Sequence, residues 1–418
     1  MTAIDLFSGA GGGSLGLVQA GFDLRFAVEM DRDAALTHHR HLPGRTLQTD
    51  IRDLAPGKLL DAAGVGVGDL DLLFAGPPCQ GFSMIGPRQI SDLRNSLFRE
   101  VLRVAEVMRP RAVVIENVPG LVTLADGHYL SGILSGLADL GYHAACAELL
   151  AAQYGAPQMR WRLVIIAWRS DLDIPHGFGF PTPSHGSAGI GELVSNVTIP
   201  EQAYAGLINT REAIGDLPAI SAGQVEDYYV GPARLPFQQQ ARTLLGGTPM
   251  SRHELHDHYS AALGRDTLAR LQHLDPGQDW RDLPFDLLPG SMKRALRKDH
   301  TRRYRRMTWD GVPRSIITRF RDPKSGEYTH PEQHRTISIR EAARIQGFPD
   351  WFSFAGANTS KYTQVGNAIP VPLARAIAGE VAACLGGMDG RARLLDPFRR
   401  RPNPMLGRFG ELAERAAA

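Results

Sequence analysis

Five residues in the first part of the chain have types that could carry out covalent and acid–base chemistry. Cys79 follows two prolines, and its thiolate would be a nucleophile, although a single cysteine is more often an inert apolar residue. Glu116 and Asn117 supply a carboxylate and an amide, a pair that also fits an ordinary turn. Arg160 and Arg162 point to the same side of an extended segment. They could bind an anion or a carbonyl, or balance the charge of Glu116.

A glycine-rich stretch at residues 7–16 predicts a ligand-binding turn. Gly11, Gly13 and Gly16 match the pattern G-x-G-x-x-G, and the acids Glu29 and Asp31 follow about 20 residues later. Glycines let the backbone approach a ligand, the helix N-terminus favours a negative group, and an acid after the next strand can bind ribose hydroxyls. The pattern fits a dinucleotide or an adenosyl ligand equally well. A glycine-rich turn without any ligand would also match it.

Strands and helices must alternate to bring these residues together. Four apolar runs are continuous, which is typical of strands buried on both faces, and they lie at 3–7, 71–75, 112–116 and 163–167. The βαβ pattern predicts an α/β fold with a doubly wound, mostly parallel sheet. Ligands bind such sheets at the carboxyl ends of the strands, which is where Cys79 and Glu116 fall. Helical periodicity returns at 338–345 and 372–384.

Length and charge predict a second domain and a polyanionic partner. The 418 residues suggest two or three domains, and from residue 169 the sequence becomes irregular, with scattered proline and glycine. The net charge is only +2, yet residues 291–321 hold eleven Lys and Arg against two acids. Such a basic belt favours a nucleic-acid partner, although solvated surface has the same composition. Residues 386–418 are expected to be a loosely ordered tail.

Composition excludes several classes of protein. With 43% hydrophobic and 22% charged residues, the chain is expected to be soluble, globular and cytoplasmic, and no apolar run approaches the roughly 18 residues that a membrane span needs. The start of the chain lacks the features of a secretion signal. Three widely separated cysteines exclude a disulfide framework and a Cys-x-x-Cys metal site. The cluster at 253–258 is not H-E-x-x-H, so we expect no metal.

Taken in order, these motifs closely resemble the DNA (cytosine-5) methyltransferase family of the bacterial restriction–modification type. The resemblance covers 1–168 and 306–385, and its motifs are the Asp-Leu-Phe-x-Gly-x-Gly-Gly turn, Pro-Pro-Cys-Gln, Glu-Asn-Val, Gln-x-Arg-x-Arg, the stretch 340–349 and Gly366–Asn367. It implies a Rossmann-like catalytic domain over 1–168 and 306–385 that uses S-adenosyl-L-methionine. Residues 169–305 would form a smaller, irregular target-recognition domain, and 386–418 the tail.

The resemblance also implies a mechanism. Cys79 would attack C6 of a cytosine that has flipped out of duplex DNA, C5 would take the methyl group, and loss of the C5 proton would release the cysteine. Glu116 would hold N3 and the exocyclic amine and donate a proton. Arg162 would contact the base carbonyl, with support from Arg160, and Asn117 would belong to the same catalytic group. The residue or water that removes the C5 proton stays open.

Cofactor and DNA contacts follow from the resemblance in the same way. The implied cofactor-binding residues are Phe7, Gly9, Gly11, Glu29, Met30, Asp50, Ile51, Pro78, Leu97, Asn367 and Ile369. Met30 stands where many relatives carry an aromatic residue against the adenine. The implied DNA contacts are Gln80, Ser83 and Arg94, in a loop that would close on the DNA, and the belt residues Arg302, Arg303, Arg305 and Arg306. Double-stranded DNA and a cognate restriction endonuclease are the expected partners of a monomer.

Three other functions could share some of these motifs. An RNA (tRNA) cytosine-5 methyltransferase on the same scaffold usually carries a Cys-Phe-Thr motif, but no cysteine occurs between Cys146 and Cys384. A nicotinamide-dependent oxidoreductase would explain the glycine turn but leave Cys79, Glu116 and Arg162 without a role. A catalytically silent DNA-binding protein would not need both Cys79 and Glu116.

Overall fold

A computed structural model describes residues 1–78, 97–172, 180–186, 205–244, 247–251, 253–295 and 302–386 of the protein. Two compact units make up the chain. The first consists of Met1–Gly155, Trp161–Gly206 and the segment that begins at Ile369, and the second of Ala156–Arg160 and Leu207–Ala368.

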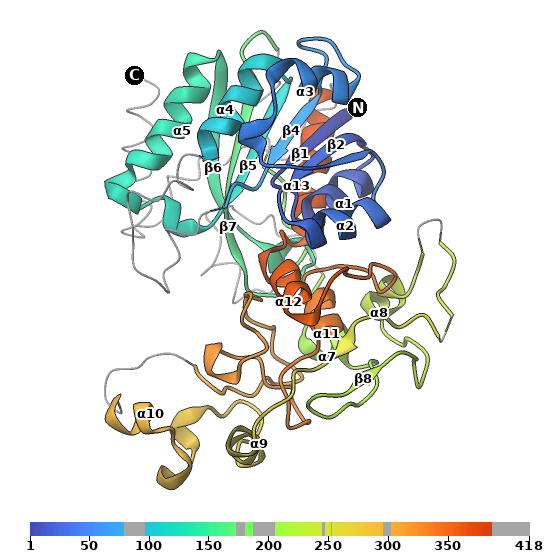
Figure 1. The fold of residues 1–418 in the computed structure, drawn as a ribbon, viewed down its shortest axis with the longest axis vertical. Coiled ribbons are helices and arrows are strands. Elements are labelled where there is room, and N and C mark those ends of the chain that lie inside the picture. Colours follow the sequence, from blue (N-terminus) through green and yellow to red (C-terminus); the bar gives the residue numbers. More distant parts are fainter. Residues whose placement is uncertain are drawn as a thin grey trace. The chain divides into compact units, whose positions relative to one another are not determined.

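A seven-stranded sheet in the order β3-β2-β1-β4-β5-β7-β6 forms the centre of the first unit (Figure 1). Its strands are β1 (Thr2–Leu6), β2 (Asp23–Glu29), β3 (Arg45–Gln48), β4 (Leu72–Ala75), β5 (Ala112–Asn117), β6 (Tyr142–Leu150) and β7 (Trp161–Arg169). The five strands from β3 to β5 pair in parallel. Strand β7 runs antiparallel to both β5 and β6, so its first residues lie at the edge of the sheet where β5 ends.

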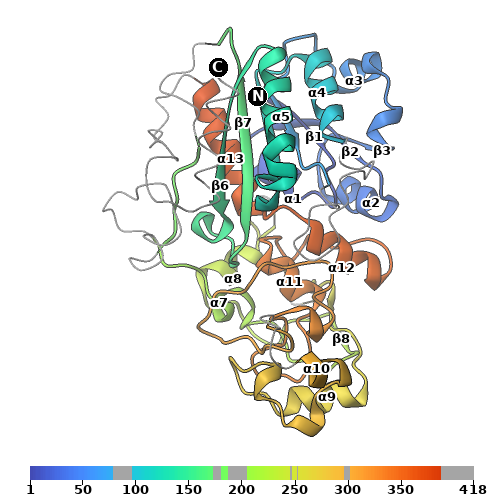
Figure 2. The same cartoon turned by 90° about the vertical axis from the view of Figure 1, so that its left-hand side faces the viewer.

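Helices cover both faces of this sheet (Figure 2). They are α1 (Gly12–Gln19), α2 (Arg32–His41), α3 (Pro56–Ala63), α4 (Leu97–Met108), α5 (His128–Asp139) and α13 (Val371–Leu385), with short 3₁₀ turns η1 (Ile51–Asp53), η3 (Pro119–Leu121), η4 (Leu124–Gly127) and η5 (Ala151–Tyr154). The main apolar core joins α3, α4 and α5 to the strands and includes Ile4 and Leu6 of β1. Because side chains alternate along a strand, Asp5 faces the other side of the sheet, where its carboxyl group meets Ser14 of α1.

The predicted α/β sheet is confirmed, together with all four predicted strands and both predicted helices. The sequence did not predict β6 or the reversed direction of β7. An antiparallel strand buried on both faces has the same continuous apolar pattern as a parallel one. The apolar pattern of 163–167 therefore does not reveal the direction of the strand.

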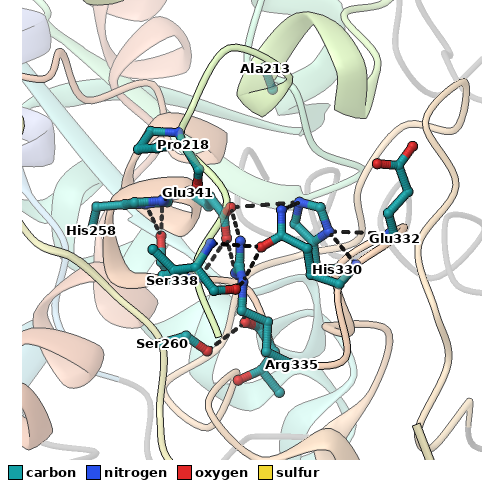
Figure 3. A network of polar contacts seen from close by, with 12 residues as sticks. Ala213, Pro218, His258, Ser260, His330, Glu332, Arg335, Ser338 and Glu341 are labelled. Atoms are coloured by element: carbon teal, nitrogen blue, oxygen red, sulfur yellow. Dashed lines mark hydrogen bonds and ion pairs between the residues drawn. The ribbon is translucent and has the colours of Figure 1, made fainter. Parts of the chain in front are cut away.

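The second unit is largely irregular, and its interior holds many charged and polar side chains beside an apolar cluster. Its elements are α7 (Thr210–Ile214), β8 (Val225–Glu226), α8 (Pro236–Ala241), β9 (His258–Tyr259), α9 (Arg265–Gln272), η6 (Trp280–Asp282), η7 (Phe285–Leu287), α10 (Gly290–Ala295), η8 (Pro323–Ser325), α11 (Ile339–Ile345) and α12 (Asn358–Asn367). Figure 3 shows Glu341 of α11 held by both terminal nitrogens of Arg335, each at 2.7 Å. Ser338 and Glu341 form the capping box that starts α11.

The compact units differ from the predicted domains in where 306–368 belongs. This segment packs with 207–295 rather than with the sheet: His258 bonds Ser338 at 2.9 Å, and Arg344 pairs with Asp216. Residues 180–186 and 205–206 belong to the first unit, although 169–305 was predicted to be a separate domain. The predicted tail beyond 386 lies outside the described residues.

Among the described residues no single helix is long and apolar enough to cross a membrane, and one bent pair, Asn358–Asn367 with Val371–Leu385, passes that test by length and composition only.

Helices α1 and α13 touch at Gly16, and this contact tests the packing of the first unit. A methyl group at Gly16 would lie 2.5 Å from Ala374 Cβ and 2.6 Å from the Arg375 nitrogen. We expect Gly16→Ala to lower the free energy of unfolding by about 1–3 kcal/mol. The backbone of α13 cannot move aside for the added methyl group as the end of a flexible side chain could. Urea denaturation measures the change.

Gly379→Ala is the matched control, since Gly379 is an exposed glycine of α13 and a Cβ added there would meet nothing within 4 Å. It should raise stability by about 0.5–1 kcal/mol through helix propensity. Equal effects of the two substitutions would contradict a close contact between α1 and α13.

Candidate active site

The glycine-rich turn follows β1 and leads into α1, as predicted. Phe7, Gly9 and Gly11 have positive φ angles of 60°, 57° and 107°, and these left-handed conformations favour glycine at the last two positions. Nothing lies within 4 Å of a Cβ placed on Gly9, so the backbone there is open to a ligand. Gly11 caps α1 without any side-chain hydrogen bond of its own, and the Ser14 amide in the first turn of the helix bonds the Asp5 carboxyl group.

Glu29, at the end of β2, holds this turn in place. Its Oε2 accepts the Gly9 N–H at 2.8 Å, and its Oε1 accepts the Asp31 N–H at 2.7 Å. Burial raises the pKa of Glu29, and the two backbone hydrogen bonds oppose that rise. The predicted ribose-binding acid therefore lies directly against the glycine turn. Met30, the next residue, has a side chain 66% exposed, so its apolar surface is open to a planar ring.

Asp50 and Ile51, which were predicted to bind the adenine, lie at the start of the short 3₁₀ turn η1, and other residues hold this turn in place. Asp50 caps η1 by accepting the Arg52 N–H and pairs with the Arg52 guanidinium at 2.5 Å. The Ile51 side chain is buried in the core. From α4, Arg103 donates to the Ile51 carbonyl at 2.8 Å and to the Leu54 carbonyl at 3.0 Å. Arg103 was not predicted, because a helical arginine has no local sequence signal for a carbonyl partner.

Glu116 and Arg162 form an ion pair at the carboxyl end of β5. Arg162 Nε lies 2.5 Å from Glu116 Oε1, and both side chains are close to nine-tenths buried. The guanidinium also donates from Nη1 to the Trp161 carbonyl at 2.7 Å. Burial lowers the pKa of Arg162, and the charge of Glu116 opposes that shift, so the arginine remains a cation. Glu116 Oε1 is buried, and Arg162 is the cation beside it among the described residues.

Further contacts bring the turn after β4 to this pair. Asn117 donates through Nδ2 to the Pro77 carbonyl at 3.3 Å, two residues before Cys79. A Cβ on Gly76 would lie 3.8 Å from Glu116 Oε2 and 3.1 Å from Ile369 Cδ1. The structure thus places Asn117 and Ile369 around the backbone that leads to Cys79. Cys79 itself, with Gln80, Ser83 and Arg94, lies outside the described residues.

Arg160 belongs to the second unit and binds backbone carbonyls there. It donates to the carbonyls of Ile316 and Gly366. Gly366 is fixed by a close approach, since a Cβ there would lie 2.5 Å from the Thr318 Cα. Asn367, the last residue of α12, is exposed. Arg160 therefore helps to order the turn before Asn367.

The basic belt divides into surface and interior arginines. Arg302 and Arg305 share Glu327, at 3.4 Å and 3.1 Å, and the Arg302 side chain is 44% exposed. Arg303 is half-buried. Arg306 is 2% exposed, and its guanidinium donates to four backbone carbonyls. The expectation that Arg306 contacts DNA is therefore wrong, because the donors that a phosphate would need are already used inside the unit.

The histidine cluster at 253–258 has structural partners. His258 is buried between Ser338 and the Pro218 carbonyl, at 2.9 Å and 2.8 Å (Figure 3). Asp257 pairs with Lys361 at 2.6 Å. Within the part of the chain that the structure describes, no group of three or more His, Cys, Asp or Glu residues is arranged to hold a metal ion.

A mostly parallel sheet with a glycine turn after its first strand and an acid at the end of its second defines a Rossmann-like α/β protein. The Glu116–Arg162 pair lies at the carboxyl end of its strand β5. The sequence matches the family of C-5 cytosine-specific DNA methylases over residues 1–383. It is 30% identical to the Type II methyltransferase M.AgeI of Thalassovita gelatinovora, covering 92% of this chain and 100% of that one. The chain belongs to the C-5 cytosine-specific DNA methylase family.

Other relatives differ in length. The chain is 32% identical to the DNA (cytosine-5)-methyltransferase PliMCI of Paracentrotus lividus, over 92% of this chain but only 28% of the longer protein. Among solved structures, a candidate DNA modification methyltransferase encoded within a prophage of E. coli superposes with a TM-score of 0.68 at 24% identity, over 92% of this chain and 99% of that one. The similarity to this solved structure supports the fold alone.

The buried Glu116–Arg162 pair makes a prediction about stability. Arg162→Met should cost about 3 kcal/mol, because it leaves a buried carboxylate without its cation. The double variant Arg162→Met with Glu116→Gln should recover most of that loss. Urea denaturation of the two single variants and the double variant measures the coupling. Additive effects would contradict an energetically coupled pair.

Proposed function

We propose that this protein transfers a methyl group from S-adenosyl-L-methionine to C5 of a cytosine flipped out of duplex DNA, at a specific sequence. The observation that carries the proposal is the buried Glu116–Arg162 pair beside the turn that leads to Cys79, in a chain of this family. A carboxylate and a guanidinium held together can bind the two polar edges of one pyrimidine ring.

The proposed catalytic steps use residues at this edge of the sheet. The Cys79 thiolate adds to C6 and leaves the electron pair of the former C5–C6 double bond on C5, which becomes a carbon nucleophile. S-adenosyl-L-methionine would supply the methyl group to C5, and S-adenosylhomocysteine would be the leaving group. Glu116 accepts from the exocyclic amine and, in its protonated form, donates a proton to N3 as charge develops there. Arg162 donates to the base carbonyl. Loss of the C5 proton and elimination of the Cys79 thiolate restore the aromatic ring.

Features of the first unit support binding of S-adenosyl-L-methionine, which would supply the methyl group. The open backbone at Gly9 would leave room for the methionine part, and Glu29 would bind the ribose hydroxyls. The exposed side chain of Met30 would pack on the adenine. Pro78, Leu97 and Ile369 would complete the walls, and Asn367, two residues before Ile369 in the sequence, is the remaining member of the proposed set.

The partners in the proposal follow from the relatives. M.AgeI is named a Type II methyltransferase, and we infer that this chain also works beside a restriction endonuclease that shares its recognition sequence. A tRNA cytosine-5 methyltransferase is the second candidate, because the same fold and reacting groups would serve both nucleic acids. DNA is favoured by the family match and by the motifs in the chain.

The proposal predicts labelled methyl transfer to duplex DNA. Wild-type protein should move label from S-adenosyl-L-methionine into DNA but not tRNA, and Cys79→Ala should abolish the transfer. Glu116→Gln should lower kcat by about 10²–10⁴, the usual contribution of a general acid. Bisulfite sequencing of the product would identify the methylated site.

The exposed variant His39→Gln is the control for handling and folding, since His39 lies on the solvent side of α2. Label in tRNA alone would favour the RNA candidate. Label in neither nucleic acid, across a panel of mixed-sequence DNA, would contradict the proposed reaction.

The surface arginines of the belt make a separate prediction about DNA affinity. Arg302→Ala and Arg305→Ala should each reduce the slope of log K against log salt concentration by about 1, because each removes one phosphate contact. Arg25→Ala is the control, since Arg25 is a partly exposed arginine of the first unit that is paired with Asp23. An unchanged slope in both belt variants would remove these residues from the DNA interface.

A further inference from the structure

A buried chain of polar side chains lies beneath the glycine-rich turn. Asp5 Oδ2 is 2.6 Å from Ser14 Oγ, Ser14 Oγ is 2.8 Å from His38 Nε2, and His38 Nδ1 is 2.9 Å from Thr46 Oγ1. The four residues come from β1, α1, α2 and β3. Asp5, Ser14 and His38 are no more than 1% exposed. The chain of hydrogen bonds therefore ties together four elements around one turn.

The glycine turn rests directly on these side chains. A Cβ on Gly13 would lie 2.9 Å from Phe74 Cε1 and 3.1 Å from Asp5 Oδ2, and a Cβ on Gly11 would lie nearest Leu42 Cδ1 and 3.1 Å from His38 Cδ2. Gly11 has no side-chain cap of its own. Asp5 and His38 are thus the polar groups in contact with the turn from below, beside the apolar Phe74 and Leu42, and Glu29 contacts it from the side.

Burying three such groups is costly unless each is bonded. A buried hydroxyl, imidazole or carboxyl without a partner costs about 1–3 kcal/mol, and apolar side chains would fill the same space more cheaply. What the polar groups add is direction, because hydrogen bonds hold their elements at a defined distance and angle. None of these side chains takes part in the proposed chemistry, and all are covered by protein.

We propose that Asp5, Ser14 and His38 are positioning residues, which hold the glycine-rich turn in the shape that binds the adenosyl cofactor. This inference rests on the proposed function. The three residues act through the backbone of Gly11 and Gly13 and do not touch the cofactor themselves.

The proton arrangement of the chain supports this role. Burial raises the pKa of Asp5 to about 7, helped by the nearby charge of Glu29 and opposed by Ser14. Burial also lowers the pKa of His38 to about 4, with a smaller effect of His39. In the structure Ser14 Oγ donates to Asp5 Oδ2. Because Ser14 uses its single O–H in that bond, it accepts from His38 Nε2–H, and Thr46 Oγ1 then donates to His38 Nδ1.

These pKa shifts give opposite pH dependences when one group is removed. The raised pKa of Asp5 means that its contribution to stability is lost as pH rises from about 4 to about 7. The lowered pKa of His38 means that its contribution is lost as pH falls from 6.5 to about 4. Relative to wild type, Asp5→Asn should therefore gain stability as pH rises from 5 to about 6.5. His38→Leu should lose stability relative to wild type as pH rises from 5 to about 7.

Cofactor binding is the direct test. Isothermal titration with S-adenosyl-L-methionine and with S-adenosylhomocysteine should show Kd raised about tenfold in Ser14→Ala and His38→Leu, the effect of one lost buried hydrogen bond. The KM for DNA and kcat at saturating cofactor should stay close to wild type. His38→Gln, which keeps a hydrogen-bonding group, should recover most of the affinity. His39→Gln is the matched control on the same helix and should bind as the wild type does.

The outcomes separate the two proposals. Wild-type protein that binds neither ligand would overturn the proposed function and this inference with it. Wild-type binding with unchanged Kd in Ser14→Ala and His38→Leu would overturn the positioning role alone. If either variant fails to fold, His38→Gln and the pH dependence of Asp5→Asn still decide the question. Parallel pH slopes in Asp5→Asn and wild type would contradict the shared proton arrangement.

Discussion

The reversed direction of β7 is the constraint on which the candidate site depends. Glu116 stands at the end of β5, opposite Val164 in an antiparallel register, so the first residues of β7 reach the same edge of the sheet. Arg162 then lies 2.5 Å from Glu116. In a parallel strand, Arg162 would lie at the opposite edge, and a buried carboxylate would lack its cation.

Buried polar contacts, rather than apolar packing alone, hold each part of the site. Glu29 joins the glycine turn to the residues after β2 by accepting from the Gly9 and Asp31 amides. Asn117 bonds the turn after β4, and Arg103 supports the η1 turn through two carbonyls. Such bonds are directional and costly to break in the interior. Each binding segment is therefore fixed by a residue behind it, and the segment itself stays open to a ligand.

The second unit uses the same principle at larger scale. Its interior holds Arg335 against Glu341 and Arg344 against Asp350, at distances of 2.6–2.7 Å, in side chains that are fully buried. Burial by itself raises the pKa of Glu341. The charge and hydrogen bonds of Arg335, together with nearby histidines, lower the pKa by more, so it ends well below its usual range. A unit with little regular secondary structure can be ordered by such pairs, because each specifies a distance and an angle. Arg306, expected at the DNA surface, belongs to this interior.

Sequence alone predicted the α/β class and the glycine turn, and it singled out Glu116 and Arg162, which the structure brings together, because these depend on local periodicity and on residue types at short spacing. Cys79, which the sequence also singled out, stays a prediction. The sequence could not determine the direction of β7, the compact unit to which 306–368 belongs, or the burial of Arg306. Those depend on contacts between residues far apart in the chain. The Asp5–Ser14–His38 chain is of the same kind. Asp5 belongs to the Asp-Leu-Phe motif, but only the tertiary structure brings Ser14 and His38 to it.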